Sequence, residues 1–194
     1  MKNYILTQQV AEKKLRRMAY EILEHNVDET QLILAGIRDN GSAIARTIQR
    51  LLREITGGRL TTRLITIALD KKKPREVILS ENERTGGSLS EGQTSDVAPN
   101  WTKFPQGQLG ADAFDGQVII VIDDVASSGK TLLYAMKPFL EAHPRKIECL
   151  VLVGRTHKAF PVHPDYIGLS LSTTLQEHIY VEVEGDEVKG AWLE

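Results

Sequence analysis

The residues best suited to chemistry lie in one short stretch, residues 118–131, which reads VIIVIDDVASSGKT. Its first five residues are apolar β-formers and predict a buried strand, at the end of which stand two carboxylates, Asp123 and Asp124. A loop of small and hydroxyl-bearing residues follows and opens an apolar helix. Such a loop offers free backbone N–H groups to a phosphate, and carboxylates at a strand tip accept hydrogen bonds from sugar hydroxyls. The stretch therefore predicts a site that holds a sugar phosphate at both ends.

The ending Gly129-Lys130-Thr131 also matches the end of the nucleotide-binding P-loop. That motif needs a glycine five positions before its second glycine, and the residue at that position is Asp124. A carboxylate there would repel a polyphosphate, which argues against an ATP or GTP site. A strand, turn and helix without any ligand is the other alternative. It would leave two adjacent acids at a strand end without a partner, which is costly.

The same stretch resembles the phosphoribosyl pyrophosphate signature of type I phosphoribosyltransferases. Three further segments resemble the PyrR family, whose members are uracil phosphoribosyltransferases and in many cases regulate pyrimidine operons by binding messenger RNA. These segments read ILTQQVAEKKLRRMAYEILEHN, LILAGIRDNGSAIAR and LVGRTHKAFPVHPDYIGLSLSTT. The likeness covers most of the chain except roughly residues 70–115. It implies transfer of the phosphoribosyl group of phosphoribosyl pyrophosphate to a nucleobase, with release of pyrophosphate.

Each part of the expected site follows from this resemblance and from the local chemistry. Asp123 and Asp124 are the expected catalytic residues, because they can hold the ribose hydroxyls directly or through Mg²⁺, for which they are also the expected metal ligands. The expected 5′-phosphate-binding residues are Ala126, Ser127, Ser128, Gly129, Lys130 and Thr131. The expected pyrophosphate-binding residues are Arg38, Asp39, Asn40 and Gly41. The expected base-binding residues are Gly154, Arg155, Tyr166 and Ile167.

Two positions bear on the choice of base. Enzymes for 6-oxopurines place an acid three residues after the second aspartate and a lysine before the later Arg-Thr pair. This chain has Ser127 and Gly154 there, which argues against hypoxanthine and guanine, whereas PyrR proteins have an aspartate at the second position. A pyrimidine, uracil, is the expected acceptor. Two alternatives stay open: a purine phosphoribosyltransferase, and a nucleotide-sensing, RNA-binding regulator of pyrimidine genes on the same fold. The candidate RNA contacts are Lys13, Arg16, Arg17, His157 and Lys158.

Composition sets the outer limits of these hypotheses. The chain has 194 residues, 41% of them hydrophobic, and a formal net charge of −2, values that suit one soluble domain without a global basic field for nucleic acid. The single cysteine, Cys149, excludes a disulfide framework, and no metal-ligand spacing is found among the histidines. Neither a membrane-spanning run nor a signal-peptide pattern is present. We expect a cytoplasmic protein without membrane contact that forms a homodimer or higher homo-oligomer.

Apolar strands alternate with amphipathic segments, which predicts an α/β protein with the type I phosphoribosyltransferase fold. Helical spacing predicts a helix over residues 8–25, capped by Thr7, and a second helix over residues 44–55 that stops at Gly57-Gly58. We expect a central parallel sheet flanked by helices, with a small C-terminal hood or hairpin that turns at Gly185-Asp186. The expected strands are residues 32–37, 62–69, 118–122, 147–153, 166–169 and 179–183.

The whole chain, residues 1–194, is expected to be one phosphoribosyltransferase domain with a long flexible loop at about residues 70–115. Residues 80–117 are polar and rich in Gly and Ser, a composition typical of a functional lid or of disorder. The Tyr-Arg-Asp of PyrR proteins after the preceding strand is replaced by Leu69-Asp70-Lys71. The cluster Lys71, Lys72, Lys73 and Arg75 is either the cationic partner of the leaving pyrophosphate or a solvated basic turn.

Overall fold

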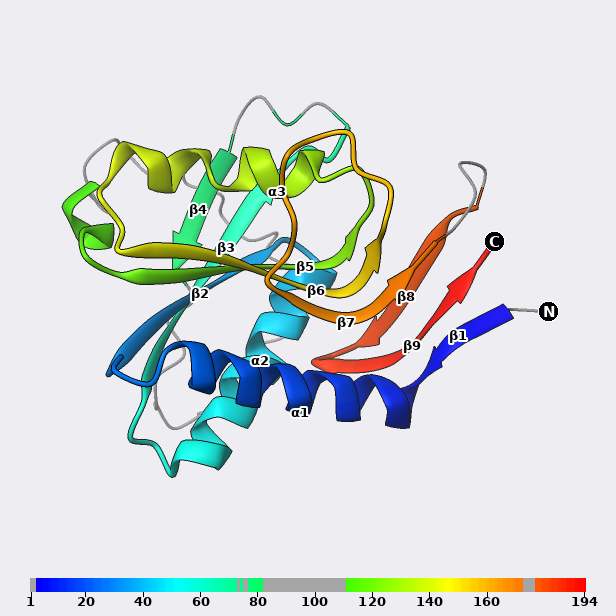
Figure 1. The fold of residues 1–194 in the computed structure, drawn as a ribbon, viewed down its shortest axis with the longest axis horizontal. Helices are drawn as coiled ribbons and strands as arrows, with labels where there is room; N and C mark the ends of the chain where they lie inside the picture. Colours follow the sequence, from blue (N-terminus) through cyan, green and yellow to red (C-terminus); the bar gives the residue numbers. More distant parts are fainter. Residues whose placement is uncertain (1–2, 73, 75–76, 82–110, 173–176) are drawn as a thin grey trace, which may run out of the picture.

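A six-stranded sheet forms the centre of the fold in the computed structural model, which describes residues 3–72, 74, 77–81, 111–172 and 177–194 (Figure 1). Its strand order is β4-β3-β2-β5-β6-β7, and all neighbours pair in parallel except β4, which is antiparallel to β3. The expected parallel sheet is thereby confirmed. The strands are β2 (Gln31–Ile37), β3 (Thr61–Leu69), β4 (Val77–Glu81), β5 (Val118–Ala126), β6 (Lys146–Arg155) and β7 (Tyr166–Leu171).

Helices cover both faces of this sheet (Figure 1). One face carries α1 (Gln8–His25) and α2 (Asn40–Thr56), and the other carries α3 (Lys130–Ala135) with the 3₁₀ turns η1 (Ala111–Phe114) and η2 (Lys137–Glu141). The Thr7 side chain accepts a hydrogen bond from the Val10 amide and caps α1, as predicted. The helix after the phosphate loop ends at Ala135, because Pro138 cannot continue it.

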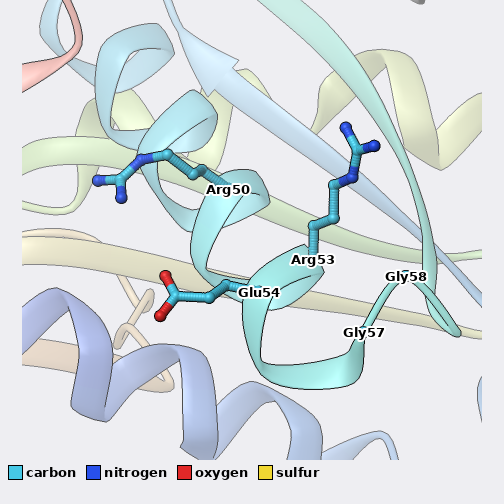
Figure 2. A pocket seen from close by; sticks show the side chains of 5 residues that line it. All are labelled: Arg50, Arg53, Glu54, Gly57 and Gly58. Atoms are coloured by element: carbon cyan, nitrogen blue, oxygen red, sulfur yellow. The ribbon is translucent and has the colours of Figure 1, made fainter.

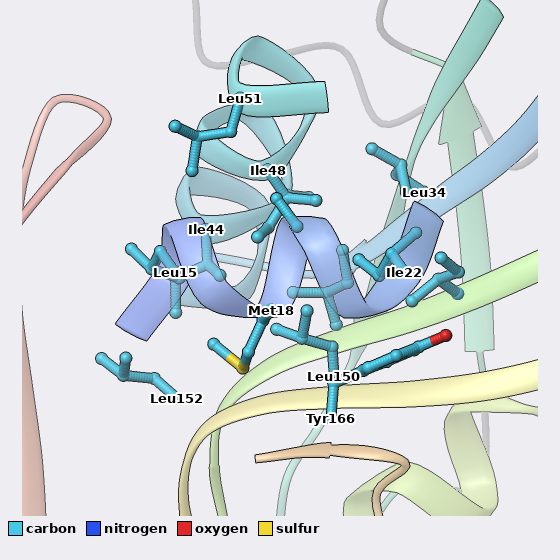
Figure 3. Close-up of a cluster of buried hydrophobic side chains, with 14 of the residues drawn as sticks. Leu15, Met18, Ile22, Leu34, Ile44, Ile48, Leu51, Leu150, Leu152 and Tyr166 are labelled. Atoms are coloured by element: carbon cyan, nitrogen blue, oxygen red, sulfur yellow. The ribbon is translucent and has the colours of Figure 1, made fainter. Parts of the chain in front are cut away.

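The larger apolar cluster lies between the sheet and the pair α1 and α2 (Figure 3). Leu15, Met18 and Ile22 of α1 point toward α2 and toward β2 and β6, and these three side chains are almost fully buried. Burial of this kind is the main stabilising term for such a layer, at roughly 2 kcal/mol for each large aliphatic side chain. The core therefore fixes the strands whose ends carry the predicted site residues. The side chains concerned include Leu15, Met18, Ile22, Leu34, Ile44, Ile48 and Leu150.

A separate three-stranded antiparallel sheet, the hood, stands beside the main sheet (Figure 1). It consists of β1 (Asn3–Thr7), β9 (Glu187–Leu193) and β8 (Ile179–Glu184), in that order. The turn between β8 and β9 contains Gly185 in the left-handed conformation, φ 61°, as the predicted hairpin requires. Among the described residues, no helix is both long and apolar enough to cross a membrane.

Several boundaries differ from the sequence-based prediction, among them the start of α2, which lies at Asn40 rather than at residue 44. The strand expected to end at Ile122 continues to Ala126, so Asp123 and Asp124 lie within β5 rather than after it. The segment expected to be a loop begins with a strand, because β4 pairs with β3 over five positions from Leu69↔Val77 to Ile65↔Glu81. Most of the predicted flexible loop at about residues 70–115, including Lys73 and Arg75, lies outside the described residues.

Candidate functional site

The carboxyl ends of β2, β5 and β6 bring most of the predicted site residues to one edge of the sheet. β5 pairs in parallel with β2 on one side and β6 on the other, so the residues that follow each strand share an edge. Asn40 Nδ2 lies 2.8 Å from Asp124 Oδ2, and Arg155 Nη1 lies 3.2 Å from Ser127 Oγ. The carboxyl ends of β5 and β6 and the residues directly after β2 and β5 are therefore in direct contact.

The predicted pyrophosphate loop enters α2 very close to β5. A Cβ atom on Gly41 would lie 2.6 Å from the carbonyl oxygen of Ile122, so only glycine allows this approach without displacing the helix. The preceding Asp39 has φ 70° and ψ −116°, a backbone conformation that a non-glycine residue adopts only under constraint. Arg38 is anchored through its amide, which donates to Ile67 O at 2.8 Å, while its side chain is half-exposed at the same edge.

Asp123 and Asp124 are held by local amides and differ in exposure. The Asp123 side chain is 1% exposed and its Oδ1 accepts from the Asp124 amide at 3.0 Å, whereas Asp124 is 13% exposed and its Oδ1 accepts from the Val125 amide at 2.8 Å. Burial, together with repulsion from Asp124, raises the pKa of Asp123 to about 7. Burial also acts to raise the pKa of Asp124, but Lys71 and the Asn40 hydrogen bond outweigh it and lower that pKa.

Lys71, just after β3, supplies the cation that faces this acid pair. Its Nζ lies 3.1 Å from Asp123 Oδ1 and 3.4 Å from Asp124 Oδ1. Burial alone would lower the pKa of Lys71, but the two carboxylates outweigh it, so the pKa is raised and the side chain stays charged. Of the basic cluster after β3, Lys71 therefore lies in the site itself rather than in a solvated turn.

The acid pair fits a magnesium ion whose remaining ligands come from substrate and water. The Oδ1 atoms of Asp123 and Asp124 converge on one point, and the Lys71 ammonium lies at that point, where a metal ion would be held. Mg²⁺ is commonly held by one or two carboxylates together with substrate phosphates and water. Among the described residues, no group of three or more His, Cys, Asp or Glu side chains could hold a metal on its own. Asp123 and Asp124 would thus hold the ion jointly with a bound substrate.

The segment that follows β6 forms hydrogen bonds with the backbone carbonyls of the predicted phosphate loop. The Ser128 carbonyl accepts from the amides of Ala159 and Phe160, both at 3.0 Å. Lys158 Nζ donates to the carbonyls of Ala126 at 3.1 Å and Ser127 at 3.3 Å, and its pKa is lowered by burial. Because these contacts use the carbonyl side of the loop, a ligand would approach it from the amide side.

Gly129 sets the direction of this loop. It adopts φ 84°, and a Cβ there would lie 3.2 Å from the Phe160 carbonyl oxygen, so a side chain would strain both the backbone and the packing. The Lys130 amide donates to Ser128 Oγ at 3.3 Å, which closes the turn into α3. The first amides of a helix have no acceptor within the helix, and together with a glycine turn they suit an anion.

The predicted base-binding residues are only partly brought together. Gly154 and Ile167 touch, since a Cβ on Gly154 would lie 3.2 Å from Ile167 Cγ2, and Arg155 contacts Ser127 at the same edge. Tyr166, in contrast, is fully buried in the cluster under α1 and pairs with Leu150, well before the strand end. The structure does not bring the Tyr166 side chain to the site, because this large aromatic ring fills the core.

A surface depression lies away from the candidate site (Figure 2). It is lined by Arg50, Arg53, Glu54, Gly57 and Gly58. These residues form the C-terminal end of α2 and the turn into β3, at the amino-terminal edge of the sheet. Figure 2 shows Arg50 and Arg53 extending from the helix in different directions rather than converging on one point. This depression therefore does not belong to the candidate site.

Comparison with known proteins identifies the class to which this fold and site belong. Residues 2–185 match the phosphoribosyl transferase domain family. The chain therefore belongs to that family, and it is a phosphoribosyltransferase. Solved structures agree in fold: the hypoxanthine phosphoribosyltransferase of Trypanosoma cruzi superposes with a TM-score of 0.67 at 12% identity, covering 100% of this chain and 96% of that one. A hypoxanthine-guanine phosphoribosyltransferase from Bacillus anthracis gives 0.66 at 13% identity, covering 98% and 97%.

Within the family the chain is PyrR-like. It is 30% identical over 193 residues to the bifunctional protein PyrR of Halalkalibacterium halodurans, and this alignment covers 97% of this chain and 96% of that protein. It is 28% identical over 188 residues to the bifunctional protein PyrR of Staphylococcus saprophyticus, with coverage of 96% and 95%. The resemblance stated from the sequence is thus confirmed, as is the type I phosphoribosyltransferase fold.

Proposed function

We propose that this phosphoribosyltransferase is Mg²⁺-dependent and transfers the phosphoribosyl group to a pyrimidine, uracil, with Asp123 and Asp124 as its catalytic residues. The observation that carries the proposal is the convergence of both carboxylates on a single cation, Lys71 Nζ, at 3.1 and 3.4 Å. Two rigidly held oxygens that point to one position can fix a ribose and a metal ion together. A flexible loop could not do so with the accuracy that catalysis requires.

The remaining site residues divide the substrate among them. The loop of residues 126–131 binds the 5′-phosphate through its amides, and residues 38–41 face the pyrophosphate with Arg38 as their cation. When bound, Mg²⁺ neutralises charge on the leaving pyrophosphate. Positive charge develops on the ribose carbon as this group leaves, so the reaction needs anchoring and electrostatic stabilisation rather than a protein nucleophile. Asp123 and Asp124 hold the ribose hydroxyls in line between base and leaving group.

Preference for a pyrimidine is supported by the uncharged side chain of Ser127, which is paired with a cation, the Arg155 guanidinium. At this position 6-oxopurine enzymes carry an acid, whereas Ser127 Oγ accepts a hydrogen bond from Arg155 Nη1 at 3.2 Å. The second position, Gly154, lies against Ile167 and leaves no room for a lysine side chain in that direction unless Ile167 moves. Neither residue offers the acid or the lysine expected for a purine. The expected acceptor pocket therefore consists of Gly154, Arg155 and Ile167, without the side chain of Tyr166.

A screen of nucleobases tests this proposal. Uracil, orotate, hypoxanthine, guanine and xanthine are each incubated with phosphoribosyl pyrophosphate and Mg²⁺, and pyrophosphate release is measured. We expect turnover with uracil to exceed that with each purine by on the order of a hundredfold, and to require Mg²⁺. Faster turnover of a purine would contradict the choice of base. Absence of turnover with every base would contradict the catalytic assignment.

The alternative of an RNA-binding regulator receives less support from the geometry. Of its candidate contacts, Arg16 is paired with Glu54, Arg17 with Glu21 and with the Ile167 carbonyl, and Lys158 with the phosphate loop. These side chains are already occupied within the chain. The discriminating measurement is binding to pyrimidine-operon leader RNA over a range of salt concentrations. A steep loss of affinity with salt would indicate several phosphate contacts and favour the regulator.

A further inference from the structure

The Lys71 ammonium stands where a divalent cation would be expected, and local structure holds it there. The Asp70 carboxylate accepts a hydrogen bond from the Lys72 amide at 2.8 Å, which turns the chain as it leaves β3. The Lys72 carbonyl in turn accepts from Lys130 Nζ at 3.3 Å, so the segment is attached to the start of α3. The position of Lys71 over the acid pair thus follows from two fixed contacts on its flanks.

The two carboxylates keep their positions independently of Lys71. Asp123 Oδ1 is bound by the Asp124 amide, Asp124 Oδ1 by the Val125 amide, and Asp124 Oδ2 by Asn40 Nδ2. All three donors belong to β5 or to the start of α2, which are rigid elements. Lys71, by comparison, is 47% exposed and reaches the site only through its flexible side chain. The lysine can therefore leave without disturbing the oxygens that it contacts.

We propose that Lys71 occupies the metal position in the substrate-free protein and excludes divalent cations from Asp123 and Asp124 until phosphoribosyl pyrophosphate binds. One position cannot hold both an ammonium and a metal ion, because their charges repel and their radii overlap. The substrate brings several negative charges, which give the displaced ammonium a new partner. This inference rests on the proposed function, since it takes the acid pair as the metal ligands. It predicts that metal and substrate bind together rather than metal first.

The inference can be tested without turnover by measuring how tightly the substrate-free protein binds Mn²⁺. Electron paramagnetic resonance detects the free ion and so gives the bound fraction. We expect weak binding by the wild type. Lys71→Met and Lys71→Gln should bind Mn²⁺ about tenfold more tightly, the size of effect expected when a partly exposed cation of this kind is removed. Lys71→Arg keeps the cation and should remain close to the wild type. Lys72→Met is the matched control and should leave the affinity unchanged, because Lys72 meets its neighbours through backbone atoms.

A double variant locates the site that gains affinity. In Lys71→Met combined with Asp124→Asn, the extra Mn²⁺ affinity should disappear. Equal affinity in wild type and Lys71→Met would overturn the inference, as would an equal gain in Lys72→Met or a gain that survives Asp124→Asn. If Lys71→Met gains affinity while the wild type turns over no nucleobase, the inference about Lys71 stands and the proposed function fails. If uracil is turned over but Mn²⁺ affinity does not change, the reverse holds.

Discussion

Two buried carboxylates on neighbouring strands, Asp123 of β5 and Glu148 of β6, are stabilised in different ways. Glu148, toward the amino-terminal end of β6, is bound by Asn26 Nδ2 at 2.9 Å and Lys146 Nζ at 3.0 Å, and the Tyr166 hydroxyl also contacts it. Asn26, directly after α1, and Tyr166 of β7 are buried, whereas the side chain of Lys146 at the start of β6 is half-exposed. Asp123 has the half-exposed Lys71 and a second acid as neighbours instead.

The difference indicates what separates a structural buried acid from a functional one. Two donors to Glu148, Asn26 and Tyr166, are buried and held by packing, and burial with Glu148 nearby raises the pKa of Tyr166 above its ordinary range, so that hydroxyl remains a donor. The partner of Asp123 can be exchanged, and its own pKa is raised to about 7. A group that is costly to keep ionised and whose partner can leave is suited to bind a cation that comes and goes. Substitutions at the two sites should therefore have opposite consequences.

The largest expected effect is the loss of activity in Asp123→Asn and Asp124→Asn. Each change is nearly isosteric and removes a like-charge repulsion, so both variants should fold. Each should lose on the order of a hundredfold to a thousandfold in kcat/KM, because contacts to the ribose and the metal are removed. Steady-state pyrophosphate release, with circular dichroism as the folding control, measures this. Turnover close to that of the wild type in both variants would show that the acid pair is not catalytic.

Glu148→Ala should do the reverse. Removing this carboxylate leaves Asn26 and Tyr166 with unmatched polar groups in the core and removes the acid that faces the half-exposed Lys146, so the free energy of unfolding should fall by about 3 kcal/mol. At temperatures where the variant is folded, kcat/KM should stay within about twofold of the wild type. Chemical denaturation and activity assays on the same preparation test both halves. A large loss of activity in fully folded Glu148→Ala would break the contrast between the two acids.

The pH dependence of stability should distinguish Asp123 next. Its pKa is about 7 in the folded state against an ordinary value of 3.8, so the folded protein keeps a proton that the unfolded chain releases. Stability should fall as pH rises from about 4 to about 7, and Asp123→Asn should lack this component. Between about pH 4 and about pH 7 the free energy of unfolding of Asp123→Asn should rise by about 2 kcal/mol relative to that of the wild type. This is about half of what the full pKa shift corresponds to, because the variant also weakens the pairing of Lys71. Parallel curves in urea titrations at pH 4, 5.5 and 8 would contradict the raised pKa.

The smallest expected effect concerns two asparagines, Asn40, which donates to Asp124, and Asn26, which donates to Glu148. Asn40 Nδ2 donates to Asp124 Oδ2 at 2.8 Å and to the Val181 carbonyl at 3.0 Å, and so joins the acid pair to the hood. Asn40→Asp replaces the donor by a carboxylate facing two acceptors and should lower kcat/KM for phosphoribosyl pyrophosphate about tenfold. Asn26→Asp, the matched change beside Glu148, should reduce stability while the folded fraction keeps its activity. Equal activity losses in the two variants would indicate a general packing effect.

The sequence was sufficient for the elements whose pattern is local. The apolar runs of β2, β5 and β6, the helical spacing of α1 and the Gly185-Asp186 turn all gave the correct element, and the small-residue loop gave the correct edge of the sheet. β1 and β4 were not predicted, because each is a five-residue strand at the edge of its sheet that pairs on one side only. Short strands without strict alternation carry little local signal.

The candidate site was likewise predictable only where its residues are contiguous in sequence. Asp123, Asp124 and the loop after them are contiguous, so their proximity needed no knowledge of strand order. Lys71 reaches the acids only because β3 lies next to β2 and β2 next to β5, a neighbourhood that residue types cannot reveal. Tyr166 illustrates the opposite error: closeness in sequence to Gly154 and Arg155 does not place its ring at their end of the sheet. Register, rather than residue type, separates it from the site.

The most direct test of the role of the acid pair is isothermal titration of phosphoribosyl pyrophosphate into wild type, Asp124→Asn and Glu148→Ala, each with and without Mg²⁺. Wild type and Glu148→Ala should bind the substrate on the order of tenfold or more tightly when Mg²⁺ is present. Asp124→Asn should lose most of this Mg²⁺-dependent gain while it retains the weaker binding through the phosphate loop. The same gain in all three proteins would contradict the account, since the metal would then be held without the carboxylates of β5.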